Sequence, residues 1–415
     1  MAKRSDAVRF AVALACALLL PAVRTWTRAR SAQPDRAAVR FVGRVDTQAI
    51  GGPRFAWSGT GFEVRFAGSS LRARLRNESP APSWVMIRVD RQPARLFEIS
   101  PGVRDYPLAD QLSPGVHTLA LQRETEGQRG ALQLQALRAE GGLLSPPGRS
   151  RRQLEVIGDS TSAGYGVRGR LGDRDCYRSE SHWLSYGAHA ARALGAELST
   201  IAVSGVGVTR NYASAAPTML ALYDRVLTND PRRAEHVQPA DAVVVNLGAN
   251  DVNDGKGDPG LAFEYRYRQL LHRIRARHPW ALIVCMLAPT LSGAKLALMQ
   301  RRIRSAIALG RDRRVIWFDG IATQTADHYA CAYHADRTQH ARMGELLAAE
   351  LRRRLAWDLP PFQAQKSSPT AHPFGRANRP SIVAHGHEGA TRWKANAHWS
   401  RVDTAASGSV WWRPW

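Results

Sequence analysis

A short apolar run near the middle of the chain ends in a glycine-rich turn that carries a serine. Residues 154–157 run directly into Gly158-Asp159-Ser160, and two more glycines follow soon after. An apolar run that stops at turn residues predicts a buried strand followed by a tight turn. Parallel α/β sheets bind ligands at the carboxyl edge of their strands, so a serine there is placed for chemistry. The tripeptide alone is also ordinary turn chemistry, and its meaning depends on the residues downstream.

From this point the chain alternates between strand and helix patterns. Apolar strand patterns recur at residues 154–157, 198–203, 242–247, 281–287 and 315–318. Helical patterns lie between and after them, at residues 183–194, 217–227, 261–277, 294–309 and 338–355. Strand-helix units of this spacing predict a parallel sheet with helices on both faces. We therefore expect a three-layer α/β domain of roughly two hundred residues, at residues 149–357.

The preceding residues, 35–148, show short strands and no helical pattern. Apolar and polar residues alternate at residues 61–68, 71–76, 84–89, 117–122 and 131–137, with turn residues between them. Several short strands of period two predict an antiparallel β-sandwich of the jelly-roll type. Pro146-Pro147-Gly148 is the expected linker to the α/β domain.

The two ends of the chain differ from both domains. Three basic residues, at positions 3, 4 and 9, precede an apolar run at residues 10–23. This run has signal-peptide length and is short for a membrane span. We expect residues 1–34 to export the chain; the alternative is an uncleaved anchor that contacts the membrane. Residues 358–415 show no periodic apolar pattern and are predicted to be a tail of low order, whose histidines lack the spacing of a zinc site.

Charge and cysteine content bear on partners and compartment. The net charge of +23 comes almost entirely from arginines scattered along the chain. They form no basic block, so a nucleic-acid partner is not predicted. Export would place the chain in an oxidising compartment. Cys285 falls in an apolar strand pattern and is expected to be a buried thiol, whereas a disulfide between Cys176 and Cys331 is a hypothesis.

Two later strand ends supply hydrogen-bond donors at the same sheet edge. Residues 198–203 lead into Ser204-Gly205, where the missing Cβ lets a backbone N–H approach a ligand. Residues 242–247 are followed by Asn250, whose side-chain amide is a donor. With the N–H of Ser160 these make three donors for an oxyanion, and losing one such donor typically costs about 3–4 kcal/mol. Either loop taken alone is explained by turn chemistry.

The general base is expected in the last loop, where three histidines compete. His340 falls inside the final predicted helix, where a packed or capping role suits it better, and His328 lies in a polar stretch where it can simply be solvated. His334 precedes that helix and follows the fifth strand, so it can reach across the sheet edge to Ser160. By position, His334 is the best placed of the three to act as the base.

These blocks, in this order, resemble the SGNH (GDSL-type) hydrolases. Longer stretches are similar to one branch, the acetyl esterases of carbohydrate esterase family 2, and the likeness covers about residues 39–357. The stretches that carry it are residues 52–63, 154–166, 209–212, 223–225 and 331–334. The resemblance implies a serine esterase that removes acetyl groups from xylan or glucomannan. The two-step acyl transfer that we expect of it requires no metal or cofactor. The resemblance assigns Ser160 as nucleophile, His334 as base, and Ser160, Gly205 and Asn250 as oxyanion donors.

One position departs from the SGNH pattern. These hydrolases usually carry an aspartate three residues before the histidine, and this chain has Cys331 there. Because members of the esterase branch it resembles can use a Ser-His dyad with the ring held by a backbone carbonyl, we expect that arrangement. Asp327 and Asp336 remain as alternative partners of the imidazole.

Two other functions compete with the acetyl esterase. An SGNH esterase for lipid or other acyl esters is one, although the sandwich domain and the lack of an apolar lid pattern argue against it. A carbohydrate-binding protein with a decayed site is the other, because Cys331 replaces the expected aspartate. Three aromatic residues are candidates for a sugar platform, although core packing is the commoner fate of each: Tyr165, Trp183 and Tyr212.

Overall fold

A computed structural model describes residues 36–212, 217–235, 237–253, 255–320 and 328–357. The predicted export segment, residues 1–34, and the predicted tail, residues 358–415, lie outside these ranges. Within the ranges, none of the helices has both the length and the apolar character needed to cross a membrane.

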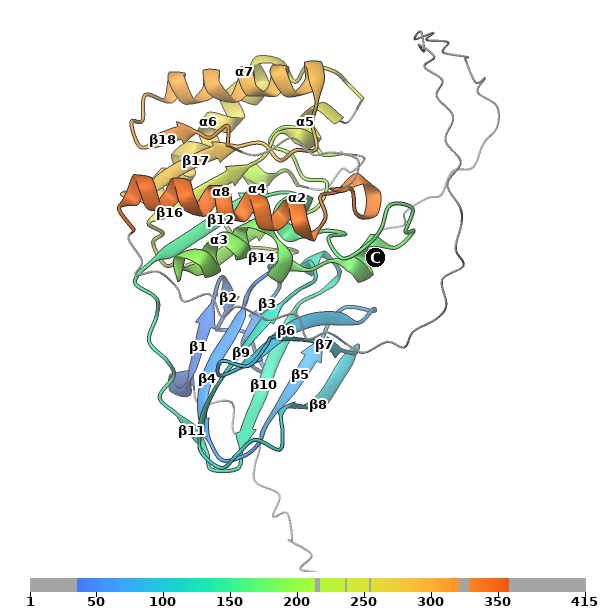
Figure 1. Cartoon of the computed structure of the whole chain (residues 1–415), viewed down its shortest axis with the longest axis vertical. Helices are drawn as coiled ribbons and strands as arrows, with labels where there is room; N and C mark the ends of the chain where they lie inside the picture. Colours follow the sequence, from blue (N-terminus) through green and yellow to red (C-terminus); the bar gives the residue numbers. More distant parts are fainter. Residues whose placement is uncertain (1–35, 213–216, 236, 254, 321–327, 358–415) are drawn as a thin grey trace, which may run out of the picture. The chain divides into compact units, whose positions relative to one another are not determined.

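The N-terminal part is an antiparallel β-sandwich, as predicted (Figure 1). In the described residues one sheet has the order β1-β4-β9-β6-β7, with β11 beside β4, and the other has the order β2-β3-β10-β5-β8. The first sheet consists of β1 (Val39–Val42), β4 (Gly61–Ala67), β6 (Ser83–Val89), β7 (Arg95–Ile99), β9 (Val116–Arg123) and β11 (Leu143–Leu144). The second consists of β2 (Val45–Asp46), β3 (Arg54–Phe55), β5 (Leu71–Asn77), β8 (Gly102–Ala109) and β10 (Leu132–Ala139).

Period-two alternation explains why the central strands were predictable. In β5, Leu71, Ala73 and Leu75 are buried between the sheets while the arginines between them are exposed. The strands that the sequence did not reveal are mostly short or lie at sheet edges. One of them, β8, carries Pro107, which an edge strand tolerates because its N–H side needs no partner strand.

The C-terminal part is a three-layer α/β domain. Its parallel sheet has the order β13-β12-β16-β17-β18 within the described residues. The five strands are β12 (Gln153–Gly158), β13 (Glu197–Ala202), β16 (Ala242–Asn246), β17 (Leu282–Met286) and β18 (Val315–Trp317). Each coincides with a predicted strand to within two residues at either end. The match is simplest for β16 and β17, because fully buried parallel strands read as nearly continuous apolar runs.

Helices cover both faces of this sheet (Figure 1). One face packs against α3 (Tyr186–Leu194) and α8 (Arg337–Leu355), and the other against α6 (Gly260–Arg277) and α7 (Gly293–Gly310). Alternate residues of the strands supply the two cores: Val156 and Val244 face α3 and α8, whereas Ile157 and Val245 face α6 and α7. The shorter helices are α2 (Ser160–Ala163), α4 (Met219–Leu222), α5 (Ala249–Asn253) and the 3₁₀ turns η1 (Arg36–Ala38), η2 (Gly127–Arg129), η3 (Cys176–Ser179), η4 (His182–Leu184) and η6 (Cys331–Tyr333).

The helix predicted at residues 217–227 is wrong in its second half. Helix α4 ends at Leu222, and the chain then forms an antiparallel hairpin of β14 (Arg225–Leu227) and β15 (Asp230–Arg233). Leu227 is buried beside Ala56 and Ala131 of the sandwich. The Trp57 indole N–H donates to the Val226 carbonyl at 3.1 Å. Burial against the other domain thus overrides the local helical pattern, and it also joins the two domains.

Candidate active site

Ser160 lies on a tight turn at the carboxyl end of β12. The strand ends at Gly158, and α2 begins at Ser160 after Asp159, whose carboxylate caps the helix by accepting from the Thr161 N–H at 3.1 Å. A Cβ on Gly158 would lie 2.0 Å from the Ser162 hydroxyl oxygen, so the turn requires glycine at that position. Strand, glycine and cap together fix the direction of the Ser160 side chain.

The structure brings His334 and Ser160 together. Nε2 of His334 lies 2.8 Å from Oγ of Ser160, although 174 positions separate the two residues along the chain. The other ring nitrogen, Nδ1, lies 3.1 Å from the Ala332 carbonyl oxygen. A carbonyl only accepts, so Nδ1 must carry a proton, and the lone pair of neutral Nε2 faces the serine hydroxyl. This is the tautomer that a general base needs.

A turn and a disulfide hold the loop that carries His334. Ala332 and Tyr333, in η6, both adopt left-handed backbone conformations, with φ of 51° and 60°. Non-glycine residues rarely adopt this conformation unless their surroundings impose it. Cys331 begins the turn and is joined to Cys176, which confirms the disulfide hypothesis. Cys285 is a buried free thiol, also as predicted.

The surroundings of His334 keep its ring neutral. Burial lowers the pKa of His334 below its usual value, and the hydrogen bond to the Ala332 carbonyl opposes that shift only in part. The ring also contacts Tyr165 edge to face, with centroids 5.1 Å apart. The imidazole is therefore packed in one orientation and is available as a base at neutral pH.

The other candidate partners have different roles. His340 is fully buried, stacks on Tyr186 and accepts from its backbone N–H at 3.1 Å, which is the packed role expected of it. Asp336 caps α8 by accepting from the Gln339 N–H at 2.8 Å, and it also lies 3.3 Å from Nδ1 of His328. Asp327 lies outside the described residues.

The predicted oxyanion donors lie in the segments that directly follow three adjacent strands, β13, β12 and β16. Gly158 pairs with Ala202 on one side and with Asn246 on the other, so the loops that hold Gly205 and Asn250 start at the edge that carries Ser160. The backbone N–H groups of Ser160 and Gly205 donate no hydrogen bond to another described residue. Both are thus available to a ligand.

Asn250 differs from the other two donors. Its side-chain amide donates to the Val206 carbonyl at 3.0 Å and to Asp159 at 3.2 Å. For Asn250 to bind an oxyanion, one of these bonds must give way. The Val206 carbonyl and the Asp159 carboxyl are thus the acceptors with which an oxyanion would compete for this amide.

The loop after β13 is held by a carboxylate that the sequence did not single out for this role. Asp251 is fully buried and accepts from the backbone N–H groups of Val208, Thr209 and Arg210 at 2.7–3.0 Å. Three donors on one carboxylate fix the loop that begins at Gly205.

The aromatic candidates separate into two groups. Tyr165 packs on His334, and Tyr212 is 55% exposed with its backbone N–H bonded to the Gly205 carbonyl at 2.8 Å. Tyr333, which the sequence did not single out, is 66% exposed next to His334. Trp183 instead packs under the Arg192 guanidinium at 4.3 Å. Two exposed rings therefore belong to the loops that carry Gly205 and His334.

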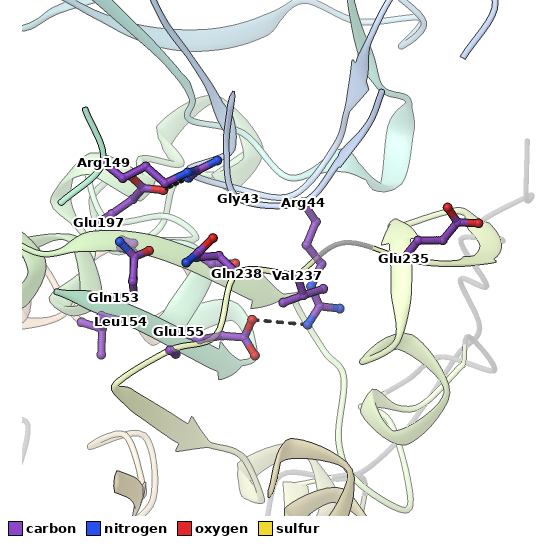
Figure 2. Close-up of a pocket in the computed structure, with 13 residues that line it drawn as sticks. Gly43, Arg44, Arg149, Gln153, Leu154, Glu155, Glu197, Glu235, Val237 and Gln238 are labelled. Atoms are coloured by element: carbon purple, nitrogen blue, oxygen red, sulfur yellow. Dashed lines mark hydrogen bonds and ion pairs between the residues drawn. The ribbon is translucent and has the colours of Figure 1, made fainter. Parts of the chain in front are cut away.

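A cavity of about 320 Å³ lies elsewhere, at the amino ends of β12 and β13 (Figure 2). Figure 2 shows Arg44 reaching from the sandwich to Glu155, and Arg149 paired with Glu197. The guanidinium nitrogen of Arg44 lies 3.3 Å from the Glu155 carboxylate. The cavity is at the opposite edge of the sheet from Ser160. Arg44 pairs with Glu155 and Arg149 with Glu197 in its lining, so it forms part of the contact between the domains.

Two protein families match the chain. Residues 41–147 match the model described as carbohydrate esterase 2 N-terminal, and residues 156–334 match the GDSL-like lipase/acylhydrolase family. The two matches cover the sandwich and the α/β domain in the order that the sequence analysis predicted.

Proteins of known activity are similar over most of the chain. Cellulase/esterase CelE of Acetivibrio thermocellus is 29% identical over 330 residues, which are 78% of this chain and 40% of CelE. An acetylxylan esterase/glucomannan deacetylase of Cellvibrio japonicus is 23% identical over 77% of this chain and 89% of its own length. A family two carbohydrate esterase from Clostridium thermocellum, solved with cellohexaose, superposes with a TM-score of 0.72 at 29% identity, covering 77% of this chain and 99% of that one. The chain thus spans less than half the length of the first of these relatives.

Proposed function

Because the chain belongs to the GDSL-type hydrolases and carries the N-terminal domain of carbohydrate esterase family 2, we propose that it is a carbohydrate O-acetyl esterase. The observation that carries this proposal is the 2.8 Å contact between Ser160 Oγ and His334 Nε2 at the carboxyl edge of the sheet. A hydroxyl bonded to a correctly oriented imidazole is the arrangement that activates a serine nucleophile.

The reaction proceeds in two acyl-transfer steps. His334 Nε2 takes the Ser160 proton while Oγ attacks the acetyl carbonyl, and the oxyanion forms against the N–H groups of Ser160 and Gly205, with the Asn250 amide as third donor. The sugar hydroxyl leaves with the proton from His334. Water, deprotonated by the same ring, then releases acetate and restores the serine.

The Ala332 carbonyl replaces the carboxylate of a triad. It fixes the tautomer and the orientation of the His334 ring. A proton on Nε2 in place of Nδ1 would prevent the ring from acting as a base, and in one well-studied triad the wrong tautomer costs about 10⁴ in kcat. Cys331 has its own role in the disulfide. Its presence therefore no longer argues for a decayed site.

Acetylated polysaccharide is the substrate class that the surroundings favour. The exposed rings of Tyr212 and Tyr333 offer flat apolar faces with polar edges, which suit sugar rings better than a long acyl chain. Two relatives are named for deacetylation of xylan and glucomannan. We extend this activity to the present chain.

Acetate release from a panel of acetylated glycans tests the proposal. Xylan and glucomannan should release acetate with the wild type and not with Ser160→Ala. Comparing p-nitrophenyl acetate with p-nitrophenyl octanoate separates the acetyl esterase from a lipase, because the lipase should prefer the longer chain. Binding of xylan without acetate release would identify a carbohydrate-binding protein instead.

We also propose that the mature chain works outside the cytoplasm. The apolar run near the N-terminus supports export, and the Cys176–Cys331 disulfide is a bond that oxidising compartments allow to persist. An alternative is a chain that stays anchored by that run. Fractionation of the producing cells separates the two.

A further inference from the structure

A glutamate of the β-sandwich reaches the loop that carries Gly205. Glu126 follows β9 and precedes η2, and it is buried. Its Oε2 accepts from the Ser204 backbone N–H at 2.7 Å, and its Oε1 accepts from the Ser204 hydroxyl. One carboxylate therefore accepts from both hydrogen-bond donors of the residue directly before Gly205.

The two sides of this turn are held by different domains. On the far side, Asp251 of the α/β domain binds residues 208–210, and the Tyr212 N–H donates to the Gly205 carbonyl. On the near side, the partner is Glu126 of the sandwich. Gly205 has a φ of 78°, a conformation that a glycine adopts freely, so the turn depends on these anchors for its shape.

Glu126 is itself fixed by buried groups. Its backbone N–H donates to Oε2 of Glu180 at 2.9 Å, and its carbonyl accepts from the fully buried Arg123 at 3.1 Å. Burial raises the pKa of Glu180 well above its usual range, and the nearby charge of Glu126 adds to that shift. Burial also raises the pKa of Glu126, but the two hydrogen bonds from Ser204 oppose that rise, so Glu126 is the member of the pair that ionises more readily.

The hydrogen bond between Glu126 and Glu180 also connects Glu126 with the segment that holds His334. Glu180 directly follows η3, which contains Cys176, and the disulfide joins Cys176 to Cys331 in the turn before His334. Glu126 therefore contacts both Ser204, next to Gly205, and Glu180, in the segment that the disulfide joins to the turn before His334.

We propose that Glu126 is a positioning residue through which the sandwich domain holds the Gly205 amide in place for the oxyanion. This inference rests on the proposed function. It assigns to the N-terminal domain a part in the chemical step, in addition to any part in packing.

Kinetics of Glu126→Ala and Glu126→Gln on p-nitrophenyl acetate test the inference in the full chain. Losing an oxyanion donor costs about 10²–10³ in kcat, so a displaced donor should lower kcat of Glu126→Ala by roughly 10- to 100-fold with KM nearly unchanged. Glutamine keeps one acceptor oxygen for Ser204 and should restore part of the loss.

Glu124→Ala is the matched control. Glu124 is equally buried, also follows β9, and also crosses to the α/β domain, where it accepts from the Ser181 hydroxyl at 2.5 Å and the Trp183 N–H at 3.2 Å. It does not contact Ser204. Both alanine variants should lose stability in urea unfolding, and only Glu126→Ala should lose kcat. Equal kcat losses in the two would overturn the inference.

Binding of methylboronic acid, which forms a tetrahedral adduct with an activated serine, gives a second readout. Glu126→Ala should weaken its inhibition at least 10-fold while leaving inhibition by acetate unchanged. Normal turnover and normal boronate binding in Glu126→Ala would refute the positioning role alone. A wild type that neither hydrolyses the ester nor binds the boronate would refute both this inference and the proposed function.

Discussion

The imidazole of His334 is oriented by the carbonyl of Ala332, two residues before it, at 3.1 Å from Nδ1. This geometry depends on an uncommon backbone, since Ala332 has a φ of 51°. In the described part of the chain the acceptor at this ring nitrogen is thus main-chain oxygen and not a carboxylate.

Ser160→Ala should abolish hydrolysis of p-nitrophenyl acetate. Removal of the nucleophile leaves the imidazole and the donors without an acyl acceptor, and loss of such a serine costs about 10⁶ in kcat in a well-studied hydrolase. Circular dichroism and thermal unfolding should match the wild type. Turnover that persists in a folded variant would remove Ser160 from the nucleophile role.

Asp336→Asn and Asp327→Asn should keep kcat within a few-fold of the wild type. Asp336 caps α8, and asparagine caps helices about as well, so stability should change little. His334→Ala, in contrast, should lose activity by at least about 10³-fold. A collapse of kcat in either aspartate variant would mean that a triad operates.

The acid limb of the pH profile should report His334. Catalysis requires the neutral ring, and burial lowers the pKa of His334 below its usual value of about 6.5. The value of kcat/KM should therefore be on a plateau at neutral pH and fall with an apparent pKa below 6.5.

Asp159 could also produce an acid limb near this pH, because burial raises its pKa to about 7. The variant Asp159→Asn keeps the helix cap and should retain the acid limb below pH 6.5. An acid limb that disappears in this variant would assign the titration to Asp159 and not to His334.

Loss of the Cys176–Cys331 disulfide should lower both stability and kcat. The bond closes a loop of 155 positions, and such crosslinks stabilise by about 2–5 kcal/mol. Cys176→Ser should also free the turn that places Ala332 and His334, so kcat should fall more than KM rises. Cys285→Ala is the control, because it removes a buried thiol away from the turn. Unchanged kcat in Cys176→Ser would show that the turn holds without the bond.

Glu155→Gln should destabilise the fold by about 3–5 kcal/mol, because it leaves the Arg44 charge buried without its partner. Burial acts to raise the pKa of Glu155, but the Arg44 charge and the hydrogen bond from His278 outweigh it and hold that pKa at about 2. This contribution to stability is present above about pH 4.5 and is lost as the pH falls toward 2. Urea unfolding between pH 7 and pH 3 should show a smaller acid-induced loss in Glu155→Gln. Equal pH dependence in the two proteins would contradict the assignment.

The sequence by itself determined the elements that local pattern controls. Apolar patterns predicted the five described strands of the parallel sheet, most simply β16 and β17, which are fully buried. Period-two alternation predicted the central strands of the sandwich. The glycine-serine turn after β12 and the histidine before α8 were readable because turns and helix starts have local residue preferences.

Tertiary structure decided what depends on distant partners. The hairpin of β14 and β15 replaced a helical pattern because Leu227 is buried against the sandwich. The Glu126 carboxylate meets Ser204 only when segments 78 positions apart in the chain come together. The Ala332 carbonyl reaches the His334 ring because the turn before His334 has left-handed backbone conformations and is tied to Cys176 by the disulfide. Hydrogen bonds need a partner within about 3 Å. Only the packed chain determines which partner that is.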